Sequence, residues 1–244
     1  MADGSKLLRL LRRVHLGGLI EEAVVNLDSY SIQAVDITSS LFANIAEEGD
    51  IDGIGEIGIG NLSLVCKYLE TFKGEVALEM DGNRLIISSS GRGKLKYLTT
   101  DPEFIPTAIK EGDVESLLGQ CIISVVLEKS VCADIVTYFG LIKPKSAKFK
   151  YDPKSKSIVV ESGLASDHQF SFQVGKAKII SEGKAPFSVE VYSEHIGAVF
   201  NVLDWSDEKE KPCLFMQDKH PIIIQQNENN LWALLPLGIE EGGE

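Results

Sequence analysis

Apolar residues recur at helical spacing near the start of the chain. Within residues 1–18, Leu7, Leu10, Leu11 and Val14 stand at positions i, i+3, i+4 and i+7, which is the spacing of one face of an α-helix. The arginines of this segment fall on the opposite side of the helical wheel, at Arg9, Arg12 and Arg13. The pattern predicts an amphipathic helix with an apolar inner face and a basic outer face.

Three further segments have the helical period, and they cover residues 61–73, 127–141 and 192–205. Asn61 is a suitable N-cap for the first of them. Short alternating or β-branched runs lie between the helices and predict strands; they cover residues 23–27, 31–35, 75–80, 84–88, 148–151, 157–161, 169–174, 188–191, 213–216 and 221–225. Many short strands with only four helices predict an α+β fold with antiparallel sheets.

The order of the predicted elements repeats along the chain. The helix at 61–73 is followed by a strand, a turn at Asp81 and a second strand, and the helix at 192–205 leads through Asp218 into strands in the same way. We therefore predict two topologically similar domains with paired helices, residues 1–100 and 120–244. The segment between them, residues 101–119, contains two prolines and no clear period, which predicts an extended connector.

Charge is distributed unevenly along a chain of otherwise ordinary globular composition. Hydrophobic residues make up 44% and charged residues 25%, which excludes disordered and collagen-like proteins. The net charge of −12 argues against a wholly basic nucleic-acid coat protein. Residues 1–18 nevertheless carry four cations against Asp3, a net of +3, which leaves −15 for the rest of the chain. A locally basic helix therefore stands on an acidic protein.

The residues that support catalysis or metal binding do not cluster in the sequence. The four cysteines form no CxxC pair, and the four histidines form no HExxH motif, so we expect buried reduced thiols and no metal site. Gly91-Arg92-Gly93-Lys94 lacks the spacing and the following Ser or Thr of a phosphate-binding loop. We expect a non-enzymatic protein without a cofactor. No apolar run is long enough to span a bilayer and no apolar signal core begins the chain, so we also expect a soluble, intracellular protein.

Three short stretches resemble one known family. They are Gln33-Ala34-Val35-Asp36 with the following Ile37-Thr38-Ser39-Ser40-Leu41-Phe42, the helix from Leu64 to Phe72 with Lys67, and the C-terminal Pro221-Ile222-Ile223-Ile224 with Leu231-Trp232-Ala233-Leu234-Leu235-Pro236. The layout and these stretches resemble the proliferating-cell-nuclear-antigen family of sliding clamps. Thr100-Asp101-Pro102 is similar to phage clamps, so a cellular or a viral origin stays open.

The resemblance implies a DNA-clamp fold and, for a two-domain chain of this length, a homotrimeric ring. Such a ring encircles duplex DNA as a processivity factor, tethers DNA polymerase and other replication or repair factors, and is loaded by an ATP-dependent clamp loader. Cations lining the hole offset phosphate repulsion without reading the bases. The residues proposed to face DNA are Lys6, Arg9, Arg12, Arg13, Lys67, Lys129 and Lys143. The last helix departs from the family because it carries Glu194, Asn201 and Asp204 instead.

The resemblance also implies a pocket for a short peptide motif of partner proteins. Carried over by position, its residues are Val35, Phe42, Ile109, Val114, Pro221, Leu235 and Pro236. Two strands, 94–98 and 169–174, and the lysines between them are candidates for the subunit interface. Three alternatives stay open: solvated charges and core residues with no such roles, a subunit of a heterotrimeric or checkpoint-type clamp, and a monomeric processivity factor that does not encircle DNA.

Overall fold

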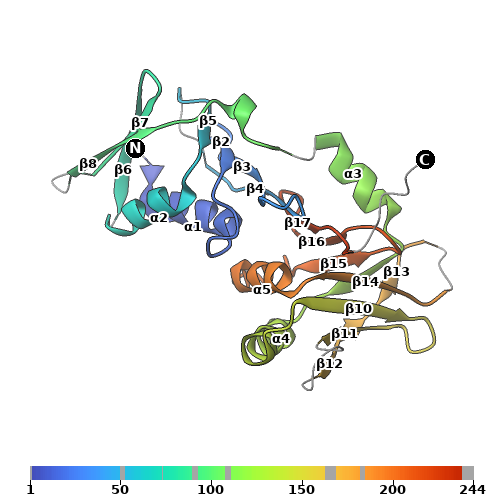
Figure 1. Ribbon diagram of the computed structural model, residues 1–244. Helices are drawn as coiled ribbons and strands as arrows, with labels where there is room; N and C mark the ends of the chain where they lie inside the picture. The colour runs from blue at the N-terminus through green and yellow to red at the C-terminus, as the bar shows by residue number, and fades with distance from the viewer. Residues whose placement is uncertain are drawn as a thin grey trace. The chain divides into compact units, whose positions relative to one another are not determined.

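A computed structural model describes residues 2–49, 53–72, 74–89, 93–107, 111–162, 169–181 and 185–237 (Figure 1). The chain divides into two compact units, an N-terminal unit, Met1–Ala108, and a C-terminal unit, Ile109–Glu244. The boundary lies inside the segment predicted as the connector. Each unit is described by itself.

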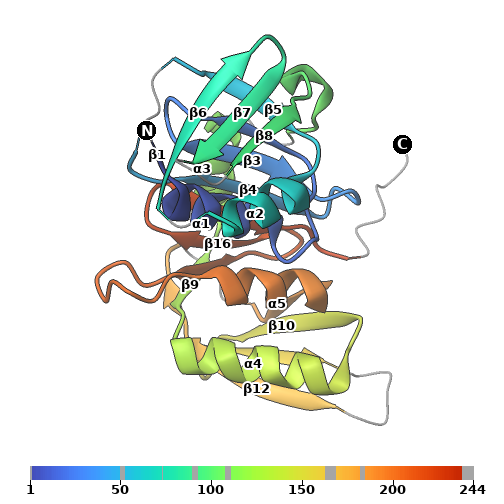
Figure 2. The same cartoon turned by 90° about the vertical axis from the view of Figure 1, so that its left-hand side faces the viewer.

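The N-terminal unit combines two helices with antiparallel strands. The helices are α1 (Gly4–His15) and α2 (Leu62–Glu70), which pack side by side (Figure 2). One sheet has the order β1 (Ala2–Asp3), β6 (Glu75–Asp81), β7 (Arg84–Ser89) and β8 (Gly93–Leu98). The other strands are hydrogen-bonded in the order β4 (Leu41–Ala46), β3 (Ser31–Val35), β2 (Ala23–Asn26) and β5 (Glu56–Ile59). A 3₁₀ turn, η1, covers Pro102–Phe104.

The C-terminal unit has the same kinds of parts. Its helices are α3 (Glu111–Gln120), α4 (Lys129–Ile142) and α5 (Ser193–Val202). One sheet has the order β12 (Phe170–Lys176), β11 (Ser157–Ser162), β10 (Ser146–Asp152) and β14 (Phe187–Tyr192). The other strands run in the order β13 (Lys178–Ile179), β9 (Ile123–Val126), β15 (Cys213–Met216), β16 (Ile222–Gln226) and β17 (Asn230–Leu234).

The longer elements of the two units follow one order. From α1 the chain runs through β2, β3, β4 and β5 to α2 and then through β6, β7 and β8. From α4 it runs through β10, β11, β12 and β14 to α5 and then through β15, β16 and β17, with only the short β13 added. The repeated order agrees with the predicted duplication.

The predicted helices form with ends close to those read from the sequence. On α1, the four residues of the apolar stripe, Leu7, Leu10, Leu11 and Val14, are at most 3% exposed. In the C-terminal unit, Phe149 and Tyr151 of β10 are buried, and so is Trp232 of β17. Amphipathic helices therefore cover the apolar faces of antiparallel sheets, as the α+β prediction requires.

The predicted extended connector is wrong in its second half, because Glu111–Gln120 is the helix α3. Only the first half, which contains both prolines, lacks an α-helix. Pro102 begins the short η1, where the Asp101 carboxylate accepts a hydrogen bond from Glu103 N at 3.1 Å. Proline restricts itself and the residue before it. No proline stands between Pro106 and Gln120, so nothing in the chain prevents a helix there.

Strand β5 was not predicted, and Gly58 gives the physical reason. A glycine in a short run weakens a strand prediction, but here the absence of a side chain admits a second backbone segment. Gly58 and Thr100 exchange two backbone hydrogen bonds, of 3.0 and 2.9 Å. A Cβ at this position would lie 2.5 Å from Thr100 O. Strands β4 and β9 were also missed; β4 opens with three buried residues in succession and so does not alternate.

All four cysteines are free thiols; three are buried, as predicted, and Cys213 is only half-buried. Cys66, Cys121 and Cys132 are buried, and burial raises the pKa of their thiols to about 11, 11 and 12. Within the described part of the chain, no group of three or more His, Cys, Asp or Glu side chains could hold a metal ion. None of the described helices is long and apolar enough to cross a membrane.

Candidate nucleic-acid interface and partner sites

Helix α1, which carries most of the candidate DNA contacts, is fixed at both ends. At its start, the Asp3 carboxylate accepts hydrogen bonds from Ser5 N at 2.9 Å and from Lys6 N at 3.4 Å, and these amides have no partner within the helix. At its end, Leu16 is left-handed with φ 50° and donates its N–H to Arg12 O at 3.2 Å. The outer side chains therefore project from a well-defined element.

Two arginines on the outer face of α1 are exposed, and each is paired with a carboxylate. Arg9 Nη2 lies 2.7 Å from Glu47 Oε2, and Arg12 Nη2 lies 2.7 Å from Glu70 Oε1. The arginine side chains are 54% and 55% exposed, so solvent and other anions can reach them. Glu70 is 45% exposed, so its pair with Arg12 is a surface ion pair of the kind that contributes little to stability, whereas the pair of Arg9 is with the buried Glu47, which also holds Arg13. Arg12 can therefore exchange Glu70 for another anion, and Arg9 can leave Glu47 while Arg13 remains as the partner of that carboxylate.

The same surface continues onto α2. Lys67 lies in its last turn and is exposed, and Glu70 follows three residues later on the same side of the helix. Because Glu70 reaches Arg12 across the helix pair, Lys67 and Arg12 share one surface. Lys6 lies half-buried one turn before Arg9, with its Nζ 2.7 Å from the backbone oxygen of Glu48. We call the four residues Lys6, Arg9, Arg12 and Lys67 the basic band.

Arg13 does not lie on the outer face, which corrects the helical-wheel assignment. Its side chain is only 7% exposed, and Nη1 lies 3.4 Å from Glu47 Oε1. Glu47 follows β4, is itself 8% exposed, and also pairs with Arg9. The Glu47 carboxylate at the end of β4 therefore holds the Arg13 side chain in a buried position. Arg13 positions Glu47 and is not available for direct contact with a phosphate in this arrangement.

The helices of the C-terminal unit carry a different pattern of charge. Lys129 begins α4 and Lys143 ends it in a left-handed conformation, with φ 49°, and both are exposed. Between them the exposed positions include Asp134. Exposed Glu194 and Asn201 lie on α5, so the departure noted in the sequence is present in the structure. Asp204 lies beyond the end of α5 at Val202.

A hollow of about 380 Å³ opens in the N-terminal unit between the segment after α1 and the end of β3. Val35, predicted as a pocket residue, lines it together with Leu19, Ile37 and Pro106. Acidic side chains complete the wall, at Glu21, Glu22 and Asp36. We call this site the acidic hollow. Its chemistry suits an apolar side chain with a neighbouring cation.

The turn after β3 holds an apolar side chain at the wall of the acidic hollow. The Asp36 carboxylate accepts hydrogen bonds from the backbone N–H groups of Thr38, Ser40 and Leu41, at 3.1, 2.7 and 2.6 Å. These contacts fix a tight turn, and Ile37 at its tip is 98% exposed. Because Ile37 lines the acidic hollow together with Leu19 and Val35, the turn places it where an occupant of the hollow would contact it.

The other predicted pocket residues have separate positions. Phe42 is 1% exposed in β4, so it belongs to the core of the N-terminal unit and does not line the acidic hollow. Ile109 and the side chain of Val114 lie outside the described residues. In the C-terminal unit, Leu235 is 40% exposed and Pro221 is half-buried before β16.

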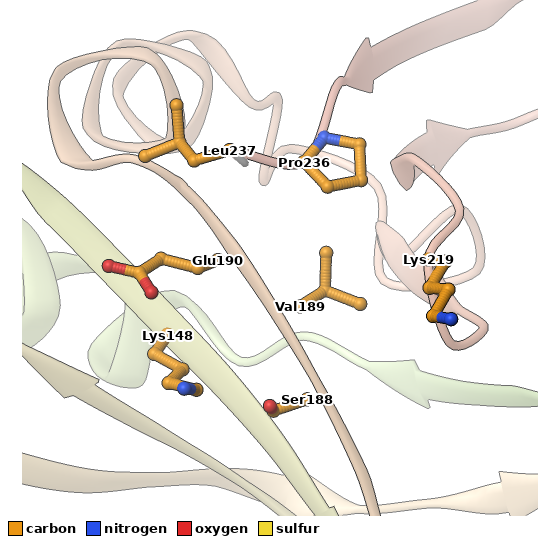
Figure 3. Close-up of a pocket in the computed structure, with 7 residues that line it drawn as sticks. All are labelled: Lys148, Ser188, Val189, Glu190, Lys219, Pro236 and Leu237. Atoms are coloured by element: carbon orange, nitrogen blue, oxygen red, sulfur yellow. The ribbon is translucent and has the colours of Figure 1, made fainter. Parts of the chain in front are cut away.

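Pro236 lines a second hollow, of about 200 Å³, in the C-terminal unit (Figure 3). Its other lining residues are Lys148, Ser188, Val189, Glu190, Lys219 and Leu237. We call it the lysine hollow. Two lysines in one small site distinguish it from the acidic hollow.

A polar network that the sequence did not reveal joins α1 to α2. His15 Nε2 lies 2.8 Å from Ser63 Oγ, which donates to Glu21 Oε1 at 2.6 Å, and Ser63 N donates to Glu21 Oε2 at 3.1 Å. Burial acts to raise the pKa of Glu21, but the Ser63 hydrogen bonds and the charge of His15 outweigh it and hold that pKa below its ordinary value. Glu21 thus caps the start of α2 while it lines the acidic hollow.

Comparison with solved structures relates the whole chain to sliding clamps. PCNA from Thermococcus kodakaraensis matches with a TM-score of 0.69 and 11% identity, over 97% of this chain and 98% of that one. A. fulgidus PCNA, bound to the C-terminal region of FEN-1, matches with a TM-score of 0.66 and 13% identity, over 96% of each chain. Helicobacter pylori beta clamp, bound to a DNA ligase peptide, matches with a TM-score of 0.67 and 11% identity, over 96% of this chain and 65% of that one.

The chain therefore has the α+β clamp fold, as predicted. The comparison with protein-family models finds no matching family, and the comparison with curated protein sequences finds no match. These matches show the fold, and the absence of enzymatic activity stays a prediction.

Proposed function

We propose that this chain, which has the fold of PCNA and of β clamps, is a subunit of a homotrimeric sliding clamp. The ring would encircle duplex DNA and tether DNA polymerase and other replication or repair factors to it. The observation that carries the proposal is the basic band on α1 and α2, in which Arg9, Arg12 and Lys67 are exposed on a chain of net charge −12. A band of cations without base-reading geometry suits sequence-independent, salt-sensitive contact with phosphates.

We place the subunit interface at the two edge strands that the sequence singled out. A ring needs a head-to-tail contact between two different surfaces, and β8 and β12 end their sheets in the two units. Beside β12, Tyr138 stacks on Phe170 with ring centroids 5.5 Å apart, and Leu98 at the end of β8 is 59% exposed. Strand edges with exposed apolar side chains favour pairing with another chain.

We assign partner binding to the acidic hollow with Ile37 at its wall. The A. fulgidus and H. pylori proteins are each bound to a peptide of another protein, which supports a peptide as the occupant here. An apolar anchor between Leu19, Val35 and Pro106, followed by a Lys or Arg near Glu22, fits the lining. Loading onto DNA would need a separate ATP-dependent loader, because a closed ring cannot thread onto DNA without an end.

The mass in solution and retention on DNA test this proposal together. By light scattering over a range of concentrations, we expect three times the 26.7 kDa mass of one chain. Loaded protein should stay on nicked circular plasmid and leave after linearisation. Phe172→Glu, which puts a charge beside the Tyr138 ring, should give the mass of a single chain and abolish retention. A wild-type species with the mass of a single chain at every concentration would contradict the homotrimer and favour a heterotrimer subunit or a non-encircling factor.

A further inference from the structure

His15 lies at the end of the basic band, between the two helices that carry it. It is the last residue of α1, three positions after Arg12, and its ring contacts Ser63 of α2. Ser63 lies four residues before Lys67, so these two side chains share one face of α2. The contact between His15 and Ser63 is therefore one helical turn from Arg12 and one from Lys67.

The hydrogen bonds around His15 determine which ring nitrogen carries a proton. The hydroxyl of Ser63 has a single proton, which it donates to Glu21 Oε1 at 2.6 Å. Ser63 Oγ must then accept from the N–H of His15 Nε2, which is 2.8 Å away. Nε2 is therefore protonated whether the ring is neutral or charged, and a further proton is added at Nδ1.

A proton can be added at Nδ1 without breaking an existing contact. No hydrogen bond from the described part of the chain reaches Nδ1, and the His15 side chain is 15% exposed. Glu21 Oε1, 3.5 Å from Nε2, and the C-terminal end of α1 favour a cation here, whereas Arg12 opposes it. Histidine ordinarily changes its charge between about pH 5 and pH 8. His15 can therefore gain a proton while its contact with Ser63 is kept.

The charges around His15 are balanced in the absence of DNA. The ionisable groups that face it from α1, from the segment after α1 and from α2 are Arg12, Glu21, Cys66, Lys67 and Glu70. Burial raises the pKa of the Cys66 thiol to about 11, so two cations stand against two carboxylates. The strands packed against α1 add Glu47 after β4, which already pairs with Arg9 and Arg13. A phosphate bound by Arg12 and Lys67 adds a negative charge and releases Glu70 from its pair with Arg12.

We propose that DNA binding to the basic band takes up a proton at His15, so that the imidazolium becomes a further cation beside Arg12 and Lys67. This proposal rests on the proposed function, since DNA supplies the phosphate. By linkage, the proton and DNA each strengthen the binding of the other by the same factor. One added charge about 10 Å away shifts a titration midpoint by about half a pH unit. DNA binding should therefore strengthen about threefold for each contacting subunit as the pH falls from about 8 to about 5.5.

Titration of the histidines by NMR tests the proton uptake directly. The full chain, labelled with ¹³C at the histidine Cε1 atoms, has four histidines, and His15→Gln identifies the signal of His15. Each signal is followed over this pH range without DNA and with an excess of a short duplex at low salt. We expect DNA to raise the midpoint of His15 by about 0.5 pH unit and to leave that of His220, in the C-terminal unit, unchanged. No rise at His15, or an equal rise at His220, would overturn the proposal.

Matched variants separate the charge of His15 from its structural role. His15→Gln keeps an N–H donor for Ser63 but has no group that titrates in this range, so it should lose the threefold strengthening of DNA binding at low pH. His220→Gln is the control and should keep it. Loss of the strengthening in both variants, or in neither, would remove the assignment to His15. A wild-type protein with the mass of a single chain, in which DNA still raises the midpoint of His15, would reject the ring and not the proton uptake.

Discussion

The helix pair α1 and α2 and the helix pair α4 and α5 hold corresponding places in two units built in the same order, but they present different charge. The first pair carries the basic band, together with two carboxylates that pair with its arginines. The second pair has Lys129 and Lys143 near the ends of α4 and an exposed acid on α5. The fold therefore tolerates either surface, because the buried faces and not the outer faces hold the helices in place.

The difference teaches where to look for function. A surface that the fold does not require is free to be selected for binding. In the proposed ring, each subunit would offer DNA one strongly basic helix pair and one nearly neutral pair. The strength of DNA contact should therefore depend mainly on the N-terminal unit.

The largest expected effect comes from removing the basic band. Arg9→Ala/Arg12→Ala/Lys67→Ala should weaken DNA retention about 100-fold near 150 mM salt. It should also flatten the slope of log K against log salt by about 2.7 for each subunit that contacts DNA, because three fewer phosphates are neutralised and fewer counterions are released. Filter binding or anisotropy over a salt series measures both. The control Lys154→Ala/Lys178→Ala/Lys209→Ala makes the same change in net charge at exposed positions away from the helices. Equal losses in both variants would remove the distinction between the units.

The next largest effect concerns the buried acid that orders the band. Glu47→Gln should lower the free energy of unfolding by about 2 kcal/mol, because a nearly buried carboxylate that pairs with both Arg9 and Arg13 is lost. Glu70→Gln, which removes an exposed partner of Arg12, should change it by less than about 0.5 kcal/mol. Urea unfolding compares the two. Equal free energies of unfolding for the two variants would show that the buried and the exposed ion pair contribute equally to stability.

A smaller effect should come from making the second helix pair resemble the first. Asn201→Lys places a cation in the last turn of α5, where the helix dipole accepts it. We expect DNA retention to rise about threefold. The slope of log K against log salt should become steeper by about 0.9 for each new phosphate contact. Unchanged retention with an unchanged salt slope would mean that α5 does not face DNA.

The smallest effect concerns how the helices are capped. The side chain at the N-cap of α4 makes no capping hydrogen bond, whereas Asn61 Oδ1 accepts from Leu64 N at 2.8 Å and Glu21 also binds Ser63 N. Because the Glu21 pKa is lowered, its contribution is present above the ordinary value of 4.5 and is lost as the pH falls through the lowered pKa. The thermal midpoint of wild type should thus lose about 1 °C more than that of Glu21→Gln between pH 6 and pH 3. An identical decline in both would contradict the assignment.

The sequence predicts what depends on local pattern. The stripe from Leu7 to Val14 specifies α1, because four apolar residues at helical spacing have few other ways to become buried together. The α+β class follows in the same way from short strands between helices. Strand β5 could not be predicted, because its glycine is explained only by the backbone of Thr100, which is distant in the sequence.

The candidate site was predicted in part for the same reason. Arg9, Arg12 and Lys67 are exposed, as their places on the helical wheel indicate. The position of Arg13 depends on Glu47, 34 residues later, and no local pattern connects the two. Ile37 stands in a polar turn sequence, and its exposure follows from the Asp36 hydrogen bonds, which the sequence does not display.

The ion pairs on α1 bear on how easily a ring could travel along DNA. A lone arginine must shed and regain its water each time it passes from one phosphate to the next. Arg9 and Arg12 instead each have a carboxylate 2.7 Å away, so a guanidinium that releases a phosphate could return to its own acid before it meets the next. Glu47 and Glu70 would lower the barrier to each step along DNA and also weaken DNA binding. Removal of these carboxylates would give a ring that binds DNA more tightly and diffuses along it more slowly.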